Sequence, residues 1–188
     1  MALTEPIRDP KQVKEFLAYY RNRGQLRNQV LVTIALHTAL RISDILRLNT
    51  SDVYDFANNR VRTSITITEK KTSKSKIVAL HKTIIKALEA YLPQAGQNEP
   101  LIINVSTSKS ISRVHAYRVI SEAANAIGVH HRVGCHSLRK TFGYHAWNSG
   151  ISPVVLTEIY NHSSYAVTKR YLGVSQDDKN TVYQGLIF

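Results

Sequence analysis

The segment from Tyr160 to Ser175, YNHSSYAVTKRYLGVS, places a histidine, two cations and a tyrosine close together in the chain. A tyrosine phenol titrates at about 10, so Tyr171 could attack an electrophile at neutral pH only with a base and positive charge beside it. The structural alternative is a half-buried helix tyrosine whose hydroxyl finds a nearby partner. Other parts of the chain must decide between these interpretations.

The segment CHSLRKTFGYHAW supplies His136 and Arg139 at positions i and i+3, which share one face of a helix. A histidine that exchanges a proton beside a fixed cation suits phosphoryl transfer. An ordinary N-capped surface helix is the alternative. A further histidine, His162, follows LTEIYN at the end of a predicted helix. Two histidines and an arginine on a predicted helix therefore precede Tyr171 in the sequence.

Arg41 follows directly on the apolar stretch at 30–40, VLVTIALHTAL, and is therefore held at the edge of the core. The N-terminus of the next predicted helix lies beside it, where backbone N–H groups favour phosphate. A rigid guanidinium there could pair with two phosphate oxygens. Alternatively, Arg41 could cap a helix C-terminus or pair with Asp44.

The segment TEKKTSKSK gathers four lysines at a predicted hairpin tip: Lys70, Lys71, Lys74 and Lys76. Such a run is commonly a solvated face. On DNA these lysines would neutralise phosphates, and one of them could protonate a leaving oxygen.

The whole chain carries 25 Lys and Arg against 13 Asp and Glu, a formal charge of +12, with a pI near 9.9. Such an excess predicts a polyanionic partner. The stretch at 30–40 is too short to span a bilayer, so no membrane association is expected. The single cysteine, Cys135, excludes an internal disulfide and fits a reducing cytoplasm.

Metal and nucleotide chemistry have little support in the sequence. His130, His131, Cys135 and His136 lie close together, but no second ligand pair at zinc spacing exists and no carboxylate is near. A Gly-rich phosphate loop of the Walker type is also missing. We therefore expect neither a metal nor a cofactor.

Apolar periodicity and turn residues predict a mainly α fold with one small antiparallel β-sheet, in the α+β class. The first helix has Asp9 as N-cap and Gly24 as its end, and the third can begin on the cap Ser43. The sheet is a hairpin of 61–69 with 76–80. Further helices are predicted at 26–40, 82–92, 112–127, 137–149, 153–160, 165–171 and 176–186. Neither a repeat nor a long linker divides the chain, so 1–188 is predicted to be a single domain.

In this order, these motifs resemble those of the tyrosine recombinase, or phage integrase, family: an Arg in TALRISDIL, a Lys in a hairpin, the His-x-x-Arg box HSLRKTFG, a His at 162 and a Tyr nine residues later. The resemblance spans about residues 10–185. It implies the fold of that family's catalytic domain and site-specific recombination of double-stranded DNA, as integration, excision or inversion.

The resemblance also implies a role for each residue. Arg41 and Arg139 would hold the non-bridging oxygens of the scissile phosphate, and His162 would add a hydrogen bond. His136 would help to take the proton from Tyr171, which attacks phosphorus to give a 3′-phosphotyrosyl bond. Lys71, which directly precedes the TSKSK turn, would be the general acid for the 5′-oxygen. The cations expected to contact DNA are Lys70, Lys74, Lys76, Lys140 and Arg170.

Family members act as tetramers on two DNA duplexes, and the tail at 172–188 is expected to dock on a neighbouring protomer or on its own core. The chain departs from the family in having Tyr160 and Asn161 where Leu-Gly is common, and in starting almost at the catalytic domain, without the expected N-terminal core-binding or arm-binding domain. Asn161 should tolerate the left-handed backbone that glycine would adopt. The alternatives are a non-catalytic or partner-dependent DNA-binding protein and, against the short chain and the tail, a type IB topoisomerase.

Overall fold

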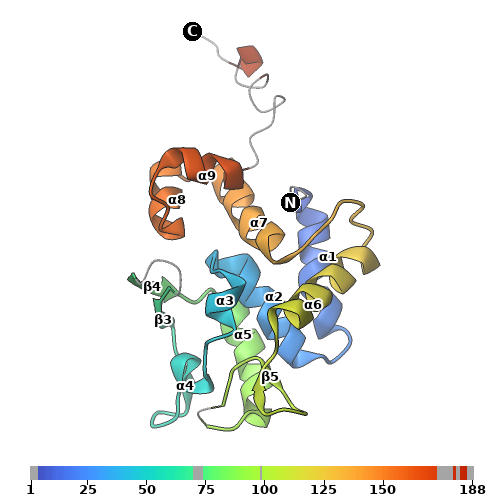
Figure 1. Ribbon diagram of the computed structural model, residues 1–188, viewed down its shortest axis with the longest axis vertical. Helices are drawn as coiled ribbons and strands as arrows, with labels where there is room; N and C mark the ends of the chain where they lie inside the picture. The colour runs from blue at the N-terminus through green and yellow to red at the C-terminus, as the bar shows by residue number, and fades with distance from the viewer. Residues whose placement is uncertain (1–3, 70–73, 98, 173–179, 181–182, 186–188) are drawn as a thin grey trace.

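Helix α2 (Leu26–Thr38) is the centre of the protein (Figure 1). The structure is a computed structural model, which describes residues 4–69, 74–97, 99–172, 180 and 183–185. The other helices pack around it or extend from its end. They are α1 (Pro10–Arg21), α3 (Ile42–Ile45), α4 (Thr50–Val53), α5 (Lys82–Tyr91), α6 (Arg113–Ala126), α7 (Cys135–Asn148), α8 (Pro153–Tyr160), α9 (Tyr165–Leu172) and the 3-10 helix η1 (Leu92–Gln94).

Local sequence explains where several helices begin. The Asp9 carboxylate accepts a hydrogen bond from the Lys11 N–H at 2.8 Å, and Pro10 occupies the first turn of α1 as predicted. Ser112 and Ser152 cap α6 and α8 in the same way. The third helix begins at Ile42 with Arg41 as its N-cap, so the prediction that Ser43 caps it was wrong. The consequence is that Arg41 itself lies where the chain enters a helix.

The predicted hairpin is confirmed as β3 (Ser64–Thr68) paired antiparallel with β4 (Ser75–Ala79), with Thr66 opposite Ile77. Strand β3 alternates exposed and buried residues, with Ile65 and Ile67 facing the core. The sheet prediction was incomplete, because two further two-stranded ladders occur in the described residues. They pair β1 (Tyr54–Asp55) with β2 (Arg60–Val61) and β5 (Ile103–Asn104) with β6 (Lys109–Ser110).

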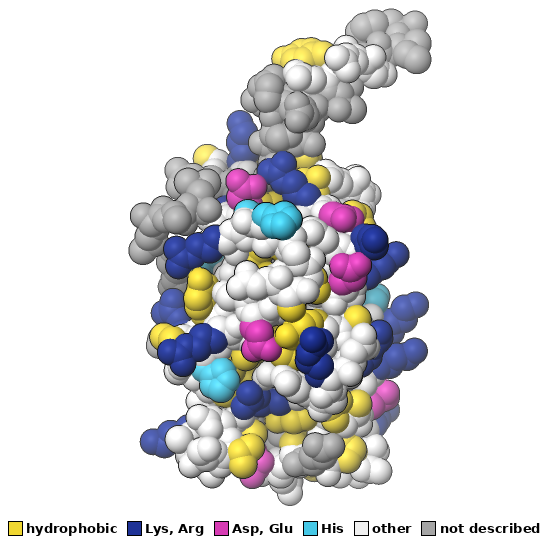
Figure 2. Space-filling view, turned by 90° about the vertical axis from the view of Figure 1, so that its right-hand side faces the viewer, with side chains coloured by type: hydrophobic (Ala, Val, Ile, Leu, Met, Phe, Trp, Pro, Cys, Tyr) yellow, Lys and Arg dark blue, Asp and Glu magenta, His cyan; other side chains and the backbone are white. Residues whose placement is uncertain are grey.

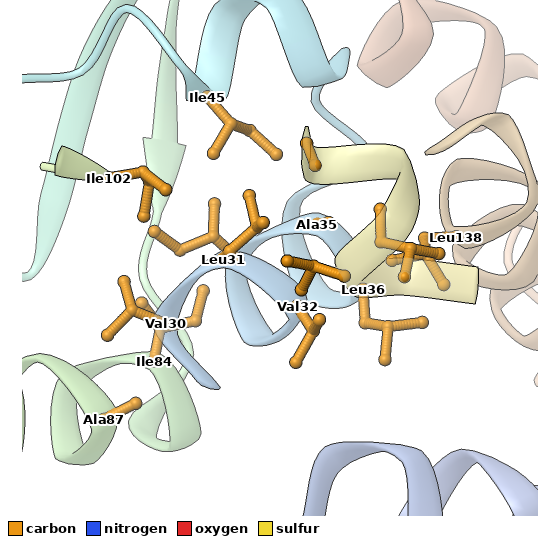
Figure 3. Packing of buried hydrophobic residues seen from close by; sticks show 14 of the residues in the cluster. Val30, Leu31, Val32, Ala35, Leu36, Ile45, Ile84, Ala87, Ile102 and Leu138 are labelled. Carbon is orange, nitrogen blue, oxygen red and sulfur yellow. The ribbon is translucent and has the colours of Figure 1, made fainter. Parts of the chain in front are cut away.

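The hydrophobic core surrounds α2, whose residues 30–36 are all buried, as the apolar stretch there predicted (Figure 3). Leu31 packs near Ile45 and Ile102, while Val30 lies toward Ile84 of α5. A second, smaller buried cluster joins the end of α2 to α8 and α9 and contains Ala39, Leu156, Tyr160 and Leu172. This second cluster holds the C-terminal helices against the end of the central helix.

The predicted helix at 176–186 and most of the tail at 172–188 lie outside the described residues. Their predicted docking therefore stays a prediction.

Candidate active site

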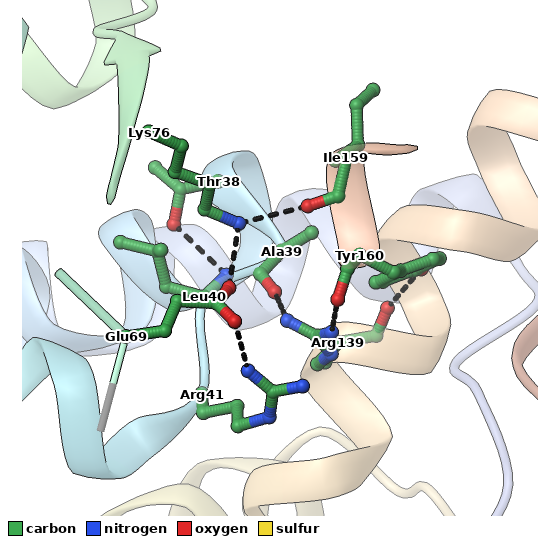
Figure 4. Close-up of polar contacts among 9 residues, drawn as sticks. All are labelled: Thr38, Ala39, Leu40, Arg41, Glu69, Lys76, Arg139, Ile159 and Tyr160. Carbon is green, nitrogen blue, oxygen red and sulfur yellow. Dashed lines mark hydrogen bonds and ion pairs between the residues drawn. The ribbon is translucent and has the colours of Figure 1, made fainter. Parts of the chain in front are cut away.

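Arg139 is the most deeply placed cation of the candidate site, with only 2% of its surface exposed. It projects from α7, and its guanidinium donates hydrogen bonds to the carbonyl oxygens of Ala39 and of Tyr160, the latter at 2.9 Å from Nη2 (Figure 4). Ala39 has φ 54, a left-handed end to α2 that turns its carbonyl out of the helix. Burial and the neighbouring Arg41 lower the pKa of Arg139, but a guanidinium remains charged in proteins.

Arg41 and Lys76 share a buried carboxylate. Nη1 of Arg41 lies 2.5 Å from Oε2 of Glu69, and Nζ of Lys76 lies 2.9 Å from Oε1 (Figure 4). The Glu69 side chain is fully buried. Lys76 also donates a hydrogen bond to the carbonyl of Ile159 at 2.8 Å, which joins the hairpin to the end of α8. Arg41 therefore has a carboxylate partner in Glu69, which the sequence analysis did not name.

His136 lies in the first turn of α7, three residues before Arg139, as the sequence predicted. The ring is solvent-accessible, yet neighbouring atoms exclude enough water that desolvation is the largest cause of a lowered pKa. Nearby cations lower it further, namely Arg139, Arg113, Lys140 and Arg41. A neutral imidazole at neutral pH can accept a proton.

His162, in the turn between α8 and α9, contacts Tyr171 near the end of α9. Their ring centroids lie 4.8 Å apart, and the Arg139 guanidinium carbon lies 5.6 Å from the Tyr171 ring centroid. The Thr168 hydroxyl lies 3.0 Å from Nδ1 of His162 and helps to hold the ring. Asn161 ends α8 with φ 53, so the left-handed backbone expected there is confirmed.

Five residues predicted to act together are therefore brought together from four parts of the chain: Arg41, His136, Arg139, His162 and Tyr171. Arginine and histidine groups beside a half-buried phenol can bind an anion and take up a proton, the two requirements of tyrosine attack on a phosphodiester.

The predicted DNA contacts fall into three groups. Lys74 is exposed. Lys76 and Lys140 are half-buried, and each donates to a backbone carbonyl; the Lys140 partner is Thr4 at 2.5 Å. Lys70 and Lys71 lie outside the described residues, as does the side chain of Arg170. The position of the expected general acid is thus not described.

Two residues of the site were missed by the sequence analysis. Glu69 follows Ile65 and Ile67 at intervals of two, so the alternation of the strand is the signal that could have indicated its inward position. Tyr160 was noted only as a departure from a family pattern, but its ring contacts both His162 and Tyr171. No sequence periodicity would have indicated that contact.

A basic hollow of about 850 Å³ lies beside His136. Its cationic walls are Arg113, Arg132 and Lys140, and Tyr117 adds an aromatic surface. Figure 2 shows Lys and Arg side chains spread over the visible face, with Asp and Glu scattered among them. The lining of the hollow therefore places three cations beside His136.

Within the described ranges, no group of three or more His, Cys, Asp or Glu side chains could hold a metal ion. In the same part of the chain, no helix combines the length and hydrophobicity that a bilayer span requires.

Comparison with known proteins shows the family of the chain. The model of the phage integrase family matches residues 8–177, which contain all five residues of the site. The chain belongs to the phage integrase family. The probable integrase/recombinase YoeC of Bacillus subtilis is 35% identical over 184 residues, covering 98% of this chain and 97% of that protein.

Longer relatives match over part of their length. The tyrosine recombinase XerD of Mycobacterium leprae is 27% identical over 170 residues, which cover 85% of this chain and 52% of XerD. The chain thus spans about half the length of that recombinase, and the other XerC and XerD relatives are similar in this respect.

The fold is that of tyrosine recombinase catalytic domains. The crystal structure of XerA recombinase superposes with a TM-score of 0.78 at 20% identity, over 98% of this chain and 65% of XerA. The post-cleavage complex of XerH with its palindromic difH substrate superposes with a TM-score of 0.76 at 19% identity. The superposition covers 94% of this chain and 52% of XerH.

Proposed function

We propose that this protein is a site-specific DNA recombinase that cuts and rejoins double-stranded DNA through a 3′-phosphotyrosyl intermediate. The observation that carries the proposal is the position of Tyr171, whose ring lies 4.8 Å from His162 and 5.6 Å from the guanidinium carbon of Arg139. A phenol held between a histidine and a buried cation can attack a phosphate that the cation binds. Membership of the phage integrase family supports the same reaction class.

Arg41 and Arg139 are the proposed phosphate clamp. Both are fixed before any ligand binds, Arg41 by Glu69 and Arg139 by two backbone carbonyls. Nε of Arg139 is buried and has no hydrogen-bond partner within the described part of the chain, so it can donate to a phosphate oxygen. Donors that are already in place stabilise the charge of the transition state without reorganising.

The remaining steps are proton transfers. His162, whose ring is held by the Thr168 hydroxyl at Nδ1, donates a hydrogen bond to the phosphate oxygens. His136, kept neutral by its lowered pKa, takes up the proton that Tyr171 releases. The 5′-oxygen leaves with a proton from Lys71, a role proposed on the resemblance alone. Rejoining reverses the ester exchange, so neither a metal nor a high-energy cofactor is required.

DNA would enter across the basic surface beside His136. Arg113 and Arg132 line that hollow from two different segments, and Arg118 is exposed on the same helix as Arg113. Cations that neutralise phosphates release counterions, so the affinity for any DNA should fall steeply with salt. We propose that Lys74 contributes from the hairpin. Lys76 and Lys140 would join the DNA contacts only by giving up their carbonyl partners.

The proposal extends to a tetramer on two duplexes, with the tail at 172–188 docking on a neighbouring protomer, and to action on the nucleoid in the cytoplasm. The DNA flanking the gene that encodes the chain is the first substrate to test.

A covalent adduct tests the reaction. The full chain is incubated with nicked duplexes from the flanking DNA and analysed on denaturing gels. Wild type should give a protein–DNA band that Tyr171→Phe abolishes. Tyr165→Phe is the matched control, because Tyr165 lies on the same helix and is 51% exposed, and it should leave the band unchanged.

The other outcomes identify the alternatives. If the chain binds DNA but forms no adduct, the proposal fails, and the chain is a DNA-binding protein that has lost turnover or needs a partner. Relaxation of supercoiled DNA by a monomer, without exchange of strands between duplexes, would indicate a type IB topoisomerase instead.

A further inference from the structure

Tyr160 is an aromatic residue in the middle of the candidate site, with its side chain fully buried. It ends α8 and belongs to the small cluster that joins this helix to the end of α2 and to α9. Burial raises the pKa of its phenol, so the hydroxyl stays protonated. Tyr160 is therefore a neutral group and not a second nucleophile.

The ring of Tyr160 contacts two candidate catalytic rings. It is stacked on His162 with centroids 5.0 Å apart and planes 14° from parallel. Its centroid is 5.2 Å from that of Tyr171, with the planes tilted by 38°. Because His162 and Tyr171 also contact each other at 4.8 Å, the three rings form a closed triangle. These separations lie in the range where aromatic pairs attract.

Tyr160 also fixes Arg139 at three points. Its carbonyl accepts a hydrogen bond from Nη2 of Arg139, and its hydroxyl donates to the backbone carbonyl of Arg139 at 2.8 Å. The guanidinium carbon lies 4.5 Å from the ring centroid, within the range of a cation–π contact. One side chain thus touches the phosphate-binding cation, the histidine and the nucleophile.

The chain makes room for this ring at Gly143 on α7. A Cβ atom at position 143 would lie far inside the van der Waals distance of the Tyr160 hydroxyl oxygen and 3.1 Å from Cζ. Glycine within a helix is otherwise unfavourable, so the close approach of the phenol accounts for the residue.

We propose that the aromatic ring of Tyr160 is a positioning element that holds His162 and Tyr171 in register with Arg139. The predicted effect of Tyr160 on DNA cleavage rests on the proposed function. Its predicted effect on the positions of the His162 and Tyr171 rings rests on geometry alone. A flexible aliphatic side chain of similar volume would fill the space but would offer neither a stacking plane nor a π face to the guanidinium.

Two substitutions separate the ring from the hydroxyl. Tyr160→Phe keeps the stack and removes only the bond to the Arg139 carbonyl, whereas Tyr160→Leu removes the ring. In single-turnover cleavage of the nicked duplex, Tyr160→Leu should lower the rate constant by about 100-fold, since a displacement of about 1 Å costs that much. Tyr160→Phe should cleave much faster than the leucine variant.

Leu156→Ala is the matched control for stability. Leu156 is fully buried in the same cluster, but it carries no proposed role in the reaction. Rates are measured well below the unfolding temperature of every variant, so that only folded protein is compared. Leu156→Ala should be less stable and should cleave at the wild-type rate.

A second readout does not depend on activity. The stacked ring of Tyr160 shifts the NMR resonances of the His162 ring protons upfield, and selective histidine labelling resolves them. Tyr160→Leu should reduce the shift to the part that the Tyr171 ring contributes, while Tyr160→Phe and Leu156→Ala should retain it in full. Gly143→Ala should also lower the unfolding temperature less in the Tyr160→Phe variant than in wild type. The reason is that the hydroxyl with which the added Cβ atom would collide is then absent.

Equal cleavage by the folded leucine variant and wild type would overturn the positioning role, as would an unshifted His162 ring in wild type. If wild type forms no adduct on any DNA, the proposed function fails, and the NMR shifts alone then decide whether Tyr160 orders the two rings.

Discussion

Replacing Glu69 by glutamine removes the carboxylate that Arg41 and Lys76 share, while keeping the size of the side chain. Glu69 is fully buried, and its oxygens lie 2.5 Å and 2.9 Å from the two cations. The glutamine carbonyl can accept a hydrogen bond from one cation only, and its NH₂ group would face the other. The variant therefore leaves both cations without their shared anion, and one of them faces a hydrogen-bond donor.

The expected loss in the free energy of unfolding follows from these contacts. A hydrogen bond to a charged group contributes about 1.5–3 kcal/mol, and breaking a buried ion pair costs about 3–5 kcal/mol. The Arg41 and Lys76 side chains are 17% and 16% exposed, so both can turn partly toward water and recover some of this energy. We expect a loss of about 2–3 kcal/mol in the free energy of unfolding. For a chain of this size, this lowers Tm by roughly 4–12 °C.

Cleavage should fall more than stability explains, because Arg41 loses the group that fixes it before DNA binds. DNA retention should persist, since the substitution raises the formal charge of the chain above +12. Glu158→Gln makes the same chemical change at an exposed position of α8 and should alter neither property.

Thermal unfolding by circular dichroism and the single-turnover cleavage assay measure the two effects. A Glu69→Gln protein that unfolds at the wild-type temperature and cleaves at the wild-type rate would refute the reasoning. It would mean that the contacts of Arg41 and Lys76 with Glu69 neither stabilise the fold nor position the clamp.

Three further predictions follow from single contacts. Arg139→Lys replaces a guanidinium that bonds two carbonyls by a single ammonium, so cleavage should fall by about 10²–10³-fold in the adduct assay while DNA is still retained. Asn161→Gly should change the free energy of unfolding by less than about 0.5 kcal/mol because φ is 53 there, whereas Asn161→Val should cost about 1–2 kcal/mol in urea denaturation. The lowered pKa of His136 means that the unfolded chain takes up a proton where the folded chain does not. Stability that is present above a pH of about 6.5 should therefore decline as the pH falls through the lower folded value, and His136→Gln should make that decline shallower in Tm measured against pH.

Much of the molecule could be predicted from the sequence because the responsible signals are local. A largely apolar stretch predicted the buried helix α2, and the alternation of apolar and polar residues predicted the hairpin β3–β4. The spacing of His136 and Arg139 placed both on one helix, and asparagine at 161 indicated a left-handed turn. The short ladders β1–β2 and β5–β6 were missed, since two-residue strands carry no periodicity.

Only the tertiary structure decided which groups meet. The Glu69 carboxylate joins Arg41 to Lys76, which lie 28 and 7 residues away in the chain, and this depends on how the hairpin packs against α2 and α8. The ring triangle of Tyr160, His162 and Tyr171 likewise depends on the angle between α8 and α9. Sequence patterns report the environment of each residue along its own element, whereas partners across elements are set by packing, which has no period in the chain.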